Sequence, residues 1–418
     1  MLKRYSPDLG LLLATLLLVA FGLIMLSSLS VYNSYTKISA QKIQEYCDSH
    51  VEVVNCEEGE GQKYAEQFCT EYNCNNLYFK RQVESAAVAL LFALLGFFVP
   101  MAVWRTLAPV IFLGAIVLLL LVFSPVGASY GTSRSWLNLP LLRSIQPVEV
   151  AKVAIIFYFA IWMSKKQNEI QTLQGGFLPF VILVSLIIIP VALQPDFGSV
   201  LVLGFVATAM FFVAGGSLIH IFGGGILASL LAWPIILSHE YIRVRFLSLF
   251  LPKLAEESDR YQIDQSLLGV GSGQFFGAGL GNGTQRYGWL PEIQGDFIFS
   301  GIAEEMGFLR LIFLIGIFFY IALRGFRIAR NAPDRFSFLV ATGITAWIVL
   351  QAAINILVAL GLFPLTGLTL PFLSYGGSSL VMTLFGIGIL LHISTLTPPE
   401  QTARRNDSRV LSSTFSVR

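Results

Sequence analysis

The residues best suited to chemistry in this chain are a few charged side chains that interrupt long apolar stretches. Glu149 and Lys152 open one such stretch, and their i,i+3 spacing places them on one face of a helix. Asp196 lies in a short turn between two stretches, and Asp296 stands at the start of another. Ionisable groups inside a membrane are costly, so each is a candidate functional group. Partial burial raises the pKa of a carboxylate such as Asp296 and suits it to act as a general base.

Each of these groups also has a purely structural interpretation. Glu149 and Lys152 would neutralise one another in a salt bridge at a helix end. Asp196 follows a proline and precedes Gly198, which is ordinary turn chemistry, and it could equally cap the next helix. Asp296 could be a plain helix N-cap. The residues alone leave both interpretations open.

Further polar residues extend the candidate site. Glu304 and Glu305 lie about two turns into the stretch after Asp296, and Arg310 is deeper, where we expect it to pair with a glutamate or to line a polar cavity. Four arginines are candidates to hold an anionic group such as a pyrophosphate, or alternatively to snorkel to lipid headgroups: Arg134, Arg243, Arg245 and Arg286.

Two segments predict irregular backbone. Residues 261–307 are rich in glycine, including Gly269, Gly271 and Gly277, which predicts a folded loop with close backbone approach. Alone, this is weak evidence for a phosphate-binding loop. The start of the last apolar stretch predicts either a cavity lining or a kinked helix end, and its candidate residues are Ser374, Tyr375, Gly376, Gly377 and Ser378.

The elements that must position these groups are membrane helices. The 418 residues are 55% hydrophobic and only 12% charged, whereas soluble domains carry roughly 25% charge. The first stretch is longer than the apolar core of a signal peptide, roughly 7–15 residues, so we interpret it as a span. An all-α polytopic fold is predicted, with about ten transmembrane helices at roughly 8–31, 82–103, 107–126, 148–164, 176–193, 198–215, 217–238, 297–323, 336–361 and 370–396.

Basic residues in the short loops predict the orientation. They place the N- and C-termini in the cytoplasm. Residues 1–396 then form one transmembrane domain, 32–81 and 239–296 are long outer loops, and 397–418 is a cytoplasmic tail. In this topology Glu149, Asp196, Asp296 and Ser374 all lie at the outer face. The net charge of +2 argues neither for nor against nucleic acid.

All four cysteines occur in the acidic outer loop 32–81: Cys47, Cys56, Cys69 and Cys74. This predicts two disulfides in an oxidising compartment. Three pairings are possible and the sequence does not choose among them. A metal knuckle is the alternative, but only Cys69 and Cys74 have a suitable spacing.

At its motifs the sequence resembles the SEDS family of shape, elongation, division and sporulation proteins, that is FtsW and RodA. The resemblance covers about 1–31 and 82–396. It rests on the order and spacing of QPVEVAK at 146–152, QPDFGS at 194–199, YQIDQSLLGVGSG at 261–273, GLGNGTQRYGWLPE at 279–292, DFIF at 296–299, AEEMG at 303–307 and PLTGLTLPFLSYGGSS at 364–379.

The resemblance implies ten transmembrane helices in the bacterial cytoplasmic membrane and polymerisation of lipid II into peptidoglycan on the outer face. It identifies Asp296 with the family's essential aspartate and Glu149 and Lys152 with its conserved pair. It also implies a class B penicillin-binding protein as partner, and the motifs look closer to the septal FtsW branch than to RodA. A divalent cation, Mg or Mn, is a possible cofactor. Two features depart from the family: Gln294-Gly295 replaces the usual His-Thr, and loop 32–81 is longer than expected.

Two other classes of function remain as alternatives, besides a RodA-type elongation polymerase. A flippase or transporter usually carries coupling charges near the bilayer midplane in repeated halves, whereas most charge here lies at helix ends and no repeat is visible. The second of these classes is a non-enzymatic scaffold for division proteins. Assays of lipid movement and of glycan product, run side by side, would separate them.

Overall fold

A computed structural model of the chain describes residues 5–49, 60–130, 133–139, 142–167, 169–238, 243, 245 and 257–396. Its longer helices are α1 Leu9–Leu29, α2 Val31–Ser49, α3 Glu60–Tyr72, α4 Leu77–Phe98, α5 Met101–Leu121, α6 Pro147–Lys165, α7 Leu178–Ala192, α8 Phe197–Val213, α9 Leu218–Ser238, α11 Glu257–Ser272, α12 Ile298–Arg330, α13 Arg335–Ala359 and α14 Gly377–Ser394. Short helical turns are η2 Cys74–Asn76, η3 Leu173–Phe177 and η5 Gln285–Tyr287.

Every predicted span coincides with an apolar helix. Among the described residues, eight helices are long and apolar enough to cross a membrane, and α8 and part of α9 form two shorter apolar helices. The mostly helical polytopic fold is therefore confirmed. Local capping explains several starts: Pro147 occupies the first turn of α6, and the side chain of Asp334 accepts from the first amides of α13.

Three features of the fold were not predicted. Strands β1 Gly127–Tyr130, β2 Ser133–Leu139 and β3 Leu142–Ile145 form an antiparallel sheet, so the all-α prediction was wrong for this segment. Helices α2 and α3 occupy part of the predicted loop 32–81. Helix α11 contains Gly269 and Gly271, which we had placed in an irregular loop.

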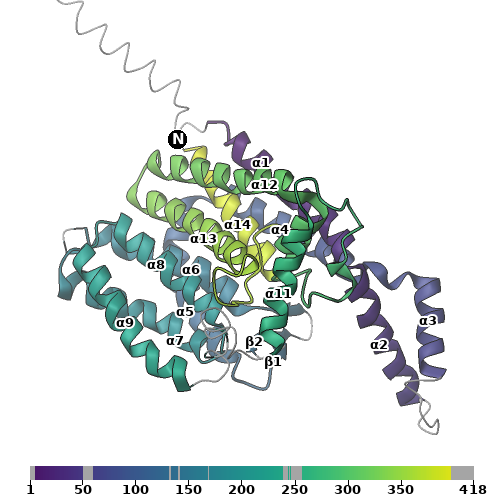
Figure 1. The fold of residues 1–418 in the computed structure, drawn as a ribbon. Coiled ribbons are helices and arrows are strands. Elements are labelled where there is room, and N and C mark those ends of the chain that lie inside the picture. The colour runs from purple at the N-terminus through teal and green to yellow at the C-terminus, as the bar shows by residue number, and fades with distance from the viewer. Residues whose placement is uncertain are drawn as a thin grey trace, which may run out of the picture.

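The core of the bundle is built on α6 and α13, which are the most buried of the eight long spans, at 72% and 78% of their central windows. Helices α4 and α14 pack at van der Waals distance because small residues face the partner backbone. A Cβ at Gly388 would lie 2.1 Å from the Ala93 carbonyl oxygen. Helix α9 lies at the periphery, against α8 (Figure 1).

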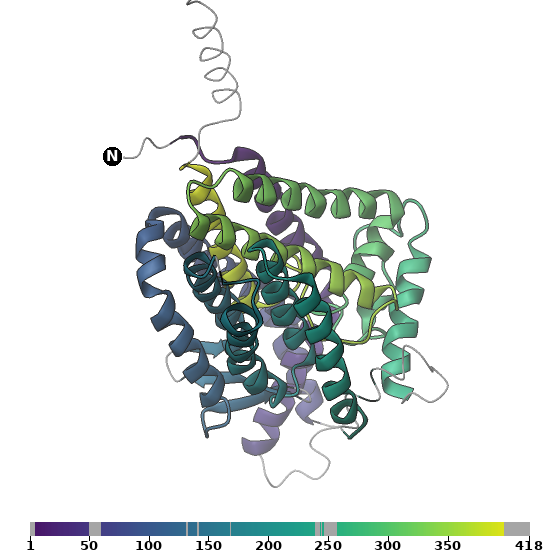
Figure 2. The same ribbon diagram turned by 90° about the vertical axis from the view of Figure 1, so that its left-hand side faces the viewer.

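The bundle has two distinct ends. At one end, Arg324 of α12 forms an ion pair with Asp8 at 2.7 Å, and the Asp8 amide donates to Ser394 at the end of α14. The three-stranded sheet lies at the other end, away from the N-terminus, as Figures 1 and 2 show. We call this second end the site end, because the starts of α6, α8 and α12 meet there.

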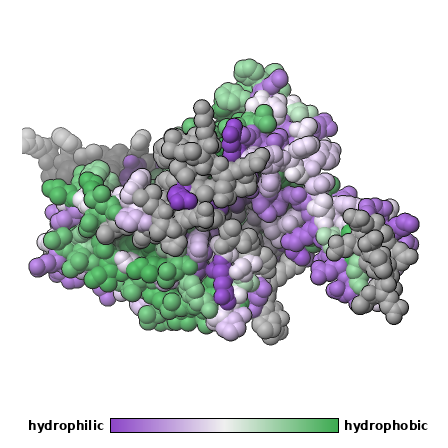
Figure 3. Space-filling view, turned by 60° about the horizontal axis from the view of Figure 1, so that its bottom comes forward, coloured by the Kyte–Doolittle hydropathy of each residue, from purple (hydrophilic) through white to green (hydrophobic). Residues whose placement is uncertain are grey.

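Helices α2 and α3 form a hairpin that projects beyond the site end (Figure 1). A disulfide joins Cys69 to Cys74 at its base. Cys47 is also disulfide-bonded, and its partner lies outside the described residues, as does Cys56. In Figure 3 the projecting lobe is mostly hydrophilic, whereas the flank of the bundle is hydrophobic. The hairpin therefore has the surface of a water-exposed element.

Helix α12 is broken within its first third, whereas the sequence predicts one continuous span. Gly307 has φ 76° and ψ 172°, which interrupts the helical hydrogen bonds. Residues 274–279 satisfy the freed groups: the amides of Ala278 and Gly279 donate to the carbonyls of Glu304 and Glu305, and two amides beyond the break donate to carbonyls at 274 and 275. This pairing allows an irregular backbone within a membrane helix.

We expect Gly307→Ala to destabilise the protein strongly. The conformation at Gly307 is rare for other residues and costs about 1–3 kcal/mol. A Cβ there would also lie 2.2 Å from the backbone nitrogen of Gly277. Thermal unfolding in detergent measures the loss, and Gly316→Ala on the same helix is the control, since nothing lies within 4 Å of its added Cβ. Equal midpoints for the two variants would contradict this account of the break.

Candidate active site

The loop before α12 is held by hydrogen bonds to three successive carbonyl groups. The Gln294 carbonyl accepts from the Tyr375 amide at 2.8 Å, and the Gly295 carbonyl accepts from the Ser374 hydroxyl at 2.6 Å. The Asp296 carbonyl accepts from the Asn355 side chain at 2.8 Å. The backbone of Asp296 is therefore fixed to α13 and to the segment before α14, whereas no hydrogen bond to its carboxylate is found within the described residues.

The carboxylate of Asp296 lies in an electrostatic environment suited to a base. It is half-buried, and this burial raises its pKa from 3.8 to about 7. The negative charges of Glu292 and Asp196 act in the same direction, and Arg245 opposes them. A carboxylate with this pKa exchanges protons near neutral pH, which is the property that general base catalysis requires.

Asp196 reaches the same end of the bundle as Asp296. Its side chain accepts from the Ser199 amide at 3.0 Å and so caps α8, as one of the two structural interpretations predicts. The helix start also packs tightly on the segment before α14, because a Cβ at Gly198 would lie 2.5 Å from the Thr366 carbonyl oxygen. Asp196 therefore has a structural role and contributes charge near Asp296.

Glu149 and Lys152 form a buried ion pair at the start of α6. Their side chains are 5% and 2% exposed and meet at 2.8 Å. Lys152 also donates to the Gln351 side chain at 2.9 Å, and Gln351 donates to the Thr369 carbonyl. The pair is thus connected through α13 to the segment that precedes α14.

Gln351 and Asn355 are the connecting residues that the sequence reasoning missed. They lie one turn apart on α13 and are essentially buried. Asn355 donates both to Asp296 and to the Leu368 carbonyl at 2.6 Å. Two amides at i,i+4 spacing inside an apolar helix were the available signal, because polar side chains inside membranes are usually hydrogen-bonded to other segments.

The segment Ser374–Ser378 joins the site through backbone and hydroxyl groups. The Gly376 amide donates to the Gln82 side chain at 3.2 Å. The ring of Tyr375 packs edge-on against Tyr78 at 4.8 Å. Ser378 accepts from the Gln146 amide, next to α6. Helix α14 begins at Gly377, seven residues later than the predicted start at 370, because this segment is irregular.

The two glutamates of α12 bind protein groups. Glu304 accepts from the Thr284 amide and hydroxyl at 2.7 Å each, and Glu305 accepts from the Ser28 hydroxyl at 2.8 Å. Arg286 donates to Ser28 and so lies beside this cluster. The predicted pairing of Arg310 with a glutamate was wrong: its guanidinium is exposed and donates to the carbonyls of 276 and 306.

Of the other candidate arginines, Arg245 lies near Asp296 and Arg134 lies in the sheet. Arg245 donates to the Leu365 carbonyl at 2.9 Å and is close enough to Asp296 to influence its pKa. Arg243 is exposed two residues earlier. Arg134 lies in β2 and donates to the Ser124 carbonyl at 2.7 Å, and its described hydrogen bonds do not connect it with Asp296.

Within the described residues, no cluster of three or more His, Cys, Asp or Glu side chains forms a set of metal ligands. These residues therefore do not provide a protein cage for a divalent cation. Magnesium bound chiefly by phosphate oxygens and water needs only one or two carboxylates.

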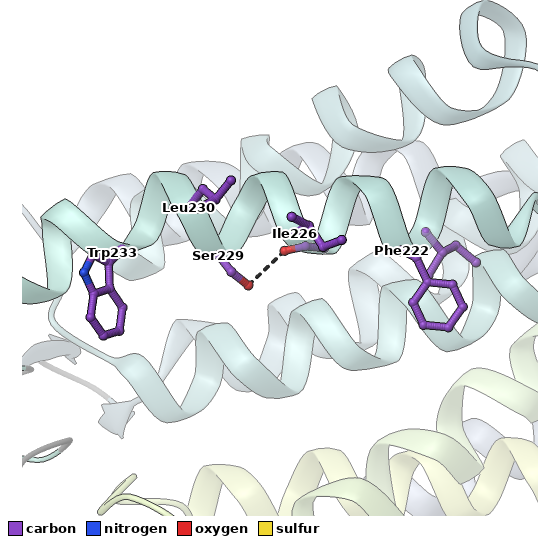
Figure 4. A pocket seen from close by; sticks show the side chains of 7 residues that line it. Phe222, Ile226, Ser229, Leu230 and Trp233 are labelled. Carbon is purple, nitrogen blue, oxygen red and sulfur yellow. Dashed lines mark hydrogen bonds between the residues drawn. The ribbon is translucent and has the colours of Figure 1, made fainter. Parts of the chain in front are cut away.

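An open apolar groove of about 470 Å³ runs along α9. Its lining comprises Ile221, Phe222, Gly225, Ile226, Ser229, Leu230 and Trp233, along one helix (Figure 4). The only side-chain hydroxyl in this lining, Ser229, is bonded to the Gly225 carbonyl of the same helix. The groove therefore offers an apolar surface and no specific polar contact.

Comparisons with known proteins place this site in context. A family model described as cell cycle protein, built on FtsW, RodA and SpoVE, matches residues 64–398. The "Probable peptidoglycan glycosyltransferase FtsW" of Trichlorobacter lovleyi is 39% identical over 318 residues, which span 76% of this chain and 83% of that protein. Stage V sporulation protein E of Bacillus subtilis is 36% identical over 394 residues, spanning 94% and 98% respectively.

Solved structures share the fold. A chain from work on the structural coordination of polymerization and crosslinking by a peptidoglycan synthase complex is similar with a TM-score of 0.70 and 25% identity, covering 93% of this chain and 98% of that one. RodA, the rod shape determining protein of Thermus thermophilus, is similar with a TM-score of 0.64 and 24% identity, covering 94% and 99%.

Proposed function

The chain belongs to the FtsW, RodA and SpoVE family of cell cycle proteins, and on that premise we propose how its site end works. The protein is a peptidoglycan glycosyltransferase of the FtsW type, a multi-pass protein of the bacterial cell membrane that acts in cell division. It would polymerise lipid II into glycan strands on the outer face of the membrane.

Asp296 would be the general base of this reaction. It would accept the proton of the acceptor sugar's 4-hydroxyl as that oxygen attacks the anomeric carbon of the donor. The bond from that carbon to the polyprenyl pyrophosphate breaks, and the pyrophosphate leaves with the electron pair. The observation that supports the role is a single half-buried carboxylate with a pKa of about 7 on a backbone held at three successive carbonyls.

The leaving pyrophosphate would be stabilised by cations near the same carboxylate. Arg245 donates to the Leu365 carbonyl and acts on the charge of Asp296, and Arg243 is exposed two residues earlier in the chain. Guanidinium groups bind phosphate oxygens in pairs and stabilise charge that develops on them. A divalent cation, if one takes part, would be bound mainly by the pyrophosphate, with Asp296, Glu292 and Asp196 as the carboxylates at this end.

The polyprenyl chain would lie in the apolar groove on α9. Helix α9 starts at the end of α8 away from Asp196 and ends at Ser238, so it runs toward the site end. Arg243 and Arg245 follow α9 in the sequence, so the chain runs from the groove toward these two cations. Trp233 lies at the end of the groove nearest to them in sequence.

We expect Gly225→Trp to weaken use of the long-chain substrate. A Cβ at Gly225 meets nothing within 4 Å, so an indole would fold into the groove without disturbing the bundle. The KM for lipid II should rise about tenfold, as for the loss of one buried apolar contact, with a smaller effect on a short-chain analogue. Gly223→Trp is the matched control, because it is equally open but does not line the groove. Equal KM values for both variants would contradict the groove assignment.

The partner would be a cross-linking transpeptidase of the class B penicillin-binding protein type. A similar chain, with a TM-score of 0.70, comes from a peptidoglycan synthase complex that coordinates polymerization and crosslinking. We therefore expect the purified chain to polymerise fully only together with such a partner.

A proteoliposome experiment tests the proposed function. Purified protein with its transpeptidase partner is supplied with lipid II, and glycan strands on a gel and lipid movement between leaflets are measured in parallel. Glycan product without lipid movement is expected. Lipid movement without product would instead identify a flippase, and absence of both would leave the scaffold hypothesis. Parallel reactions with EDTA show whether a divalent cation is required.

A further inference from the structure

We propose that Asn33 and Gln294 are positioning residues that hold the Glu292 carboxylate beside Asp296. Through them the α2–α3 hairpin contacts the loop before α12. This inference rests on the proposed function. One of the two residues, Gln294, lies in the Gln294-Gly295 pair that replaces the usual His-Thr of the family resemblance.

A chain of hydrogen bonds runs from α2 to Glu292. The Asn33 side-chain amide donates to Gln294 Oε1 at 2.6 Å, and Gln294 Nε2 donates to Glu292 Oε2 at 3.1 Å. Gln294 is only 2% exposed, so both ends of its amide need these partners. Since the carboxylate only accepts, Gln294 must present its NH₂ to Glu292 and its oxygen to Asn33, which fixes its orientation.

The carboxylate of Glu292 is exposed and would otherwise adopt several rotamers. The Glu292 carbonyl also accepts from the Gly295 amide at 2.9 Å, in a turn where Glu292 has φ 52°. This left-handed conformation is uncommon for a residue other than glycine. A Cβ placed on Gly295 would lie 3.9 Å from Glu292 Oε2, so the carboxylate lies against the residue that precedes Asp296.

The corner between α1 and α2 is packed on this loop at two further points. A Cβ at Gly288 would lie 2.4 Å from a ring carbon of Tyr32, and Arg286 donates to Ser28 at the end of α1. The corner between α1 and α2 is therefore a fixed support for residues 286–294. A movement of the projecting hairpin would reach Glu292 through Asn33.

The charged groups that act on Asp296 come from three segments. Glu292 on its own loop and Asp196 before α8 raise its pKa, and Arg245 before α11 lowers it. The ionised form of Asp296 is the base, so the rate rises as the pH passes through this pKa. Removing the charge of Glu292 favours the ionised form and moves the rising limb of the pH profile to lower pH.

The experiment measures the pH profile of lipid II polymerisation for wild type and four variants: Glu292→Gln, Asn33→Leu, both combined, and Thr36→Ala. Glu292→Gln should move the rising limb to lower pH by roughly half a unit or more. Asn33→Leu should move it in the same direction by less, and should add nothing in the Glu292→Gln background. Thr36→Ala is the control, because its hydroxyl bonds only within α2.

If the rising limb of the pH profile lies at the same pH in Glu292→Gln as in wild type, the inference is overturned. Because Glu292 is exposed, this variant should fold normally. An equal shift by Asn33→Leu with and without Glu292 would also overturn it, since the effect would not pass through that carboxylate. Failure of the proposed function would give a different result. The wild type would then form no glycan strands, or Asp296→Ala would form as many strands as the wild type.

Discussion

Replacing Asp296 with asparagine is expected to abolish polymerisation of lipid II while leaving the protein folded. Loss of a general base lowers the rate by about 10²–10⁴-fold. The amide has nearly the same shape, and the backbone contacts of Asp296 to Asn355 and its neighbours do not involve the carboxylate. Initial rates of strand formation with the transpeptidase partner measure the effect. Asp264→Asn, on the exposed face of α11, is the matched control and should retain full activity.

The pH dependence of the rate and of the stability tests the role of Asp296 independently. The pKa of Asp296 in the folded protein is raised to about 7, so the wild-type rate should fall about tenfold per pH unit below that value. Because the folded pKa lies above the ordinary 3.8, ionisation of Asp296 costs folding stability as the pH rises between the two values. Asp296→Asn should therefore unfold at a higher temperature than wild type at pH 8. An inactive variant that is also less stable would point to a structural role instead.

Replacing Lys152 alone with methionine is expected to cost about 3–5 kcal/mol of unfolding free energy, because it leaves a buried carboxylate without its counter-ion. Glu149 has few other partners: its Oε2 makes no hydrogen bond among the described residues. Gln351 would lose one of the two donors to its side-chain oxygen and keep the other, the Trp347 indole at 2.8 Å. Thermal or denaturant unfolding in detergent measures the loss.

The double replacement, Glu149→Gln with Lys152→Met, separates charge from shape. It removes both charges together, and replacing a whole buried pair is often nearly neutral. We expect it to recover most of the stability lost in the single variant. If the recovered protein also polymerises lipid II, the pair is structural, and if it is folded but inactive, the pair acts in the reaction. A double variant as unstable as the single one would contradict the argument from unpaired charge.

The sequence was sufficient to predict the membrane-spanning helices, although not α2, α3 or α11, and it predicts one end for the candidate groups. Apolar length alone identifies a span, because the bilayer sets a fixed thickness. Glu149, Asp196 and Asp296 each precede or open a span at a loop on the same side, so their convergence followed from topology. The starts of α4 and α5 were placed about five residues late, since polar or basic residues in their first turns lower the local hydropathy.

Features that depend on contacts between distant segments were not predictable. Glycine is common within membrane helices, so the sequence around Gly307 does not predict a break. The break depends on hydrogen bonds to the backbone at 274–279. Arg310 was expected to pair with a carboxylate, but the break turns it toward two carbonyls. The roles of Gln351 and Asn355 required knowledge of which segments lie opposite α13.

The interruption at Gly307 has a consequence for biogenesis. Insertion machinery selects nascent segments by hydrophobicity. The part of α12 before the break carries Glu304 and Glu305, whereas the part after it is a long apolar run. We therefore expect the residues beyond the break to supply the hydrophobic length that the insertion machinery recognises. The portion before the break, which follows Asp296, is held instead by its backbone pairing with residues 274–279. The position of the proposed site thus depends on this pairing and not on the hydrophobicity of the span alone.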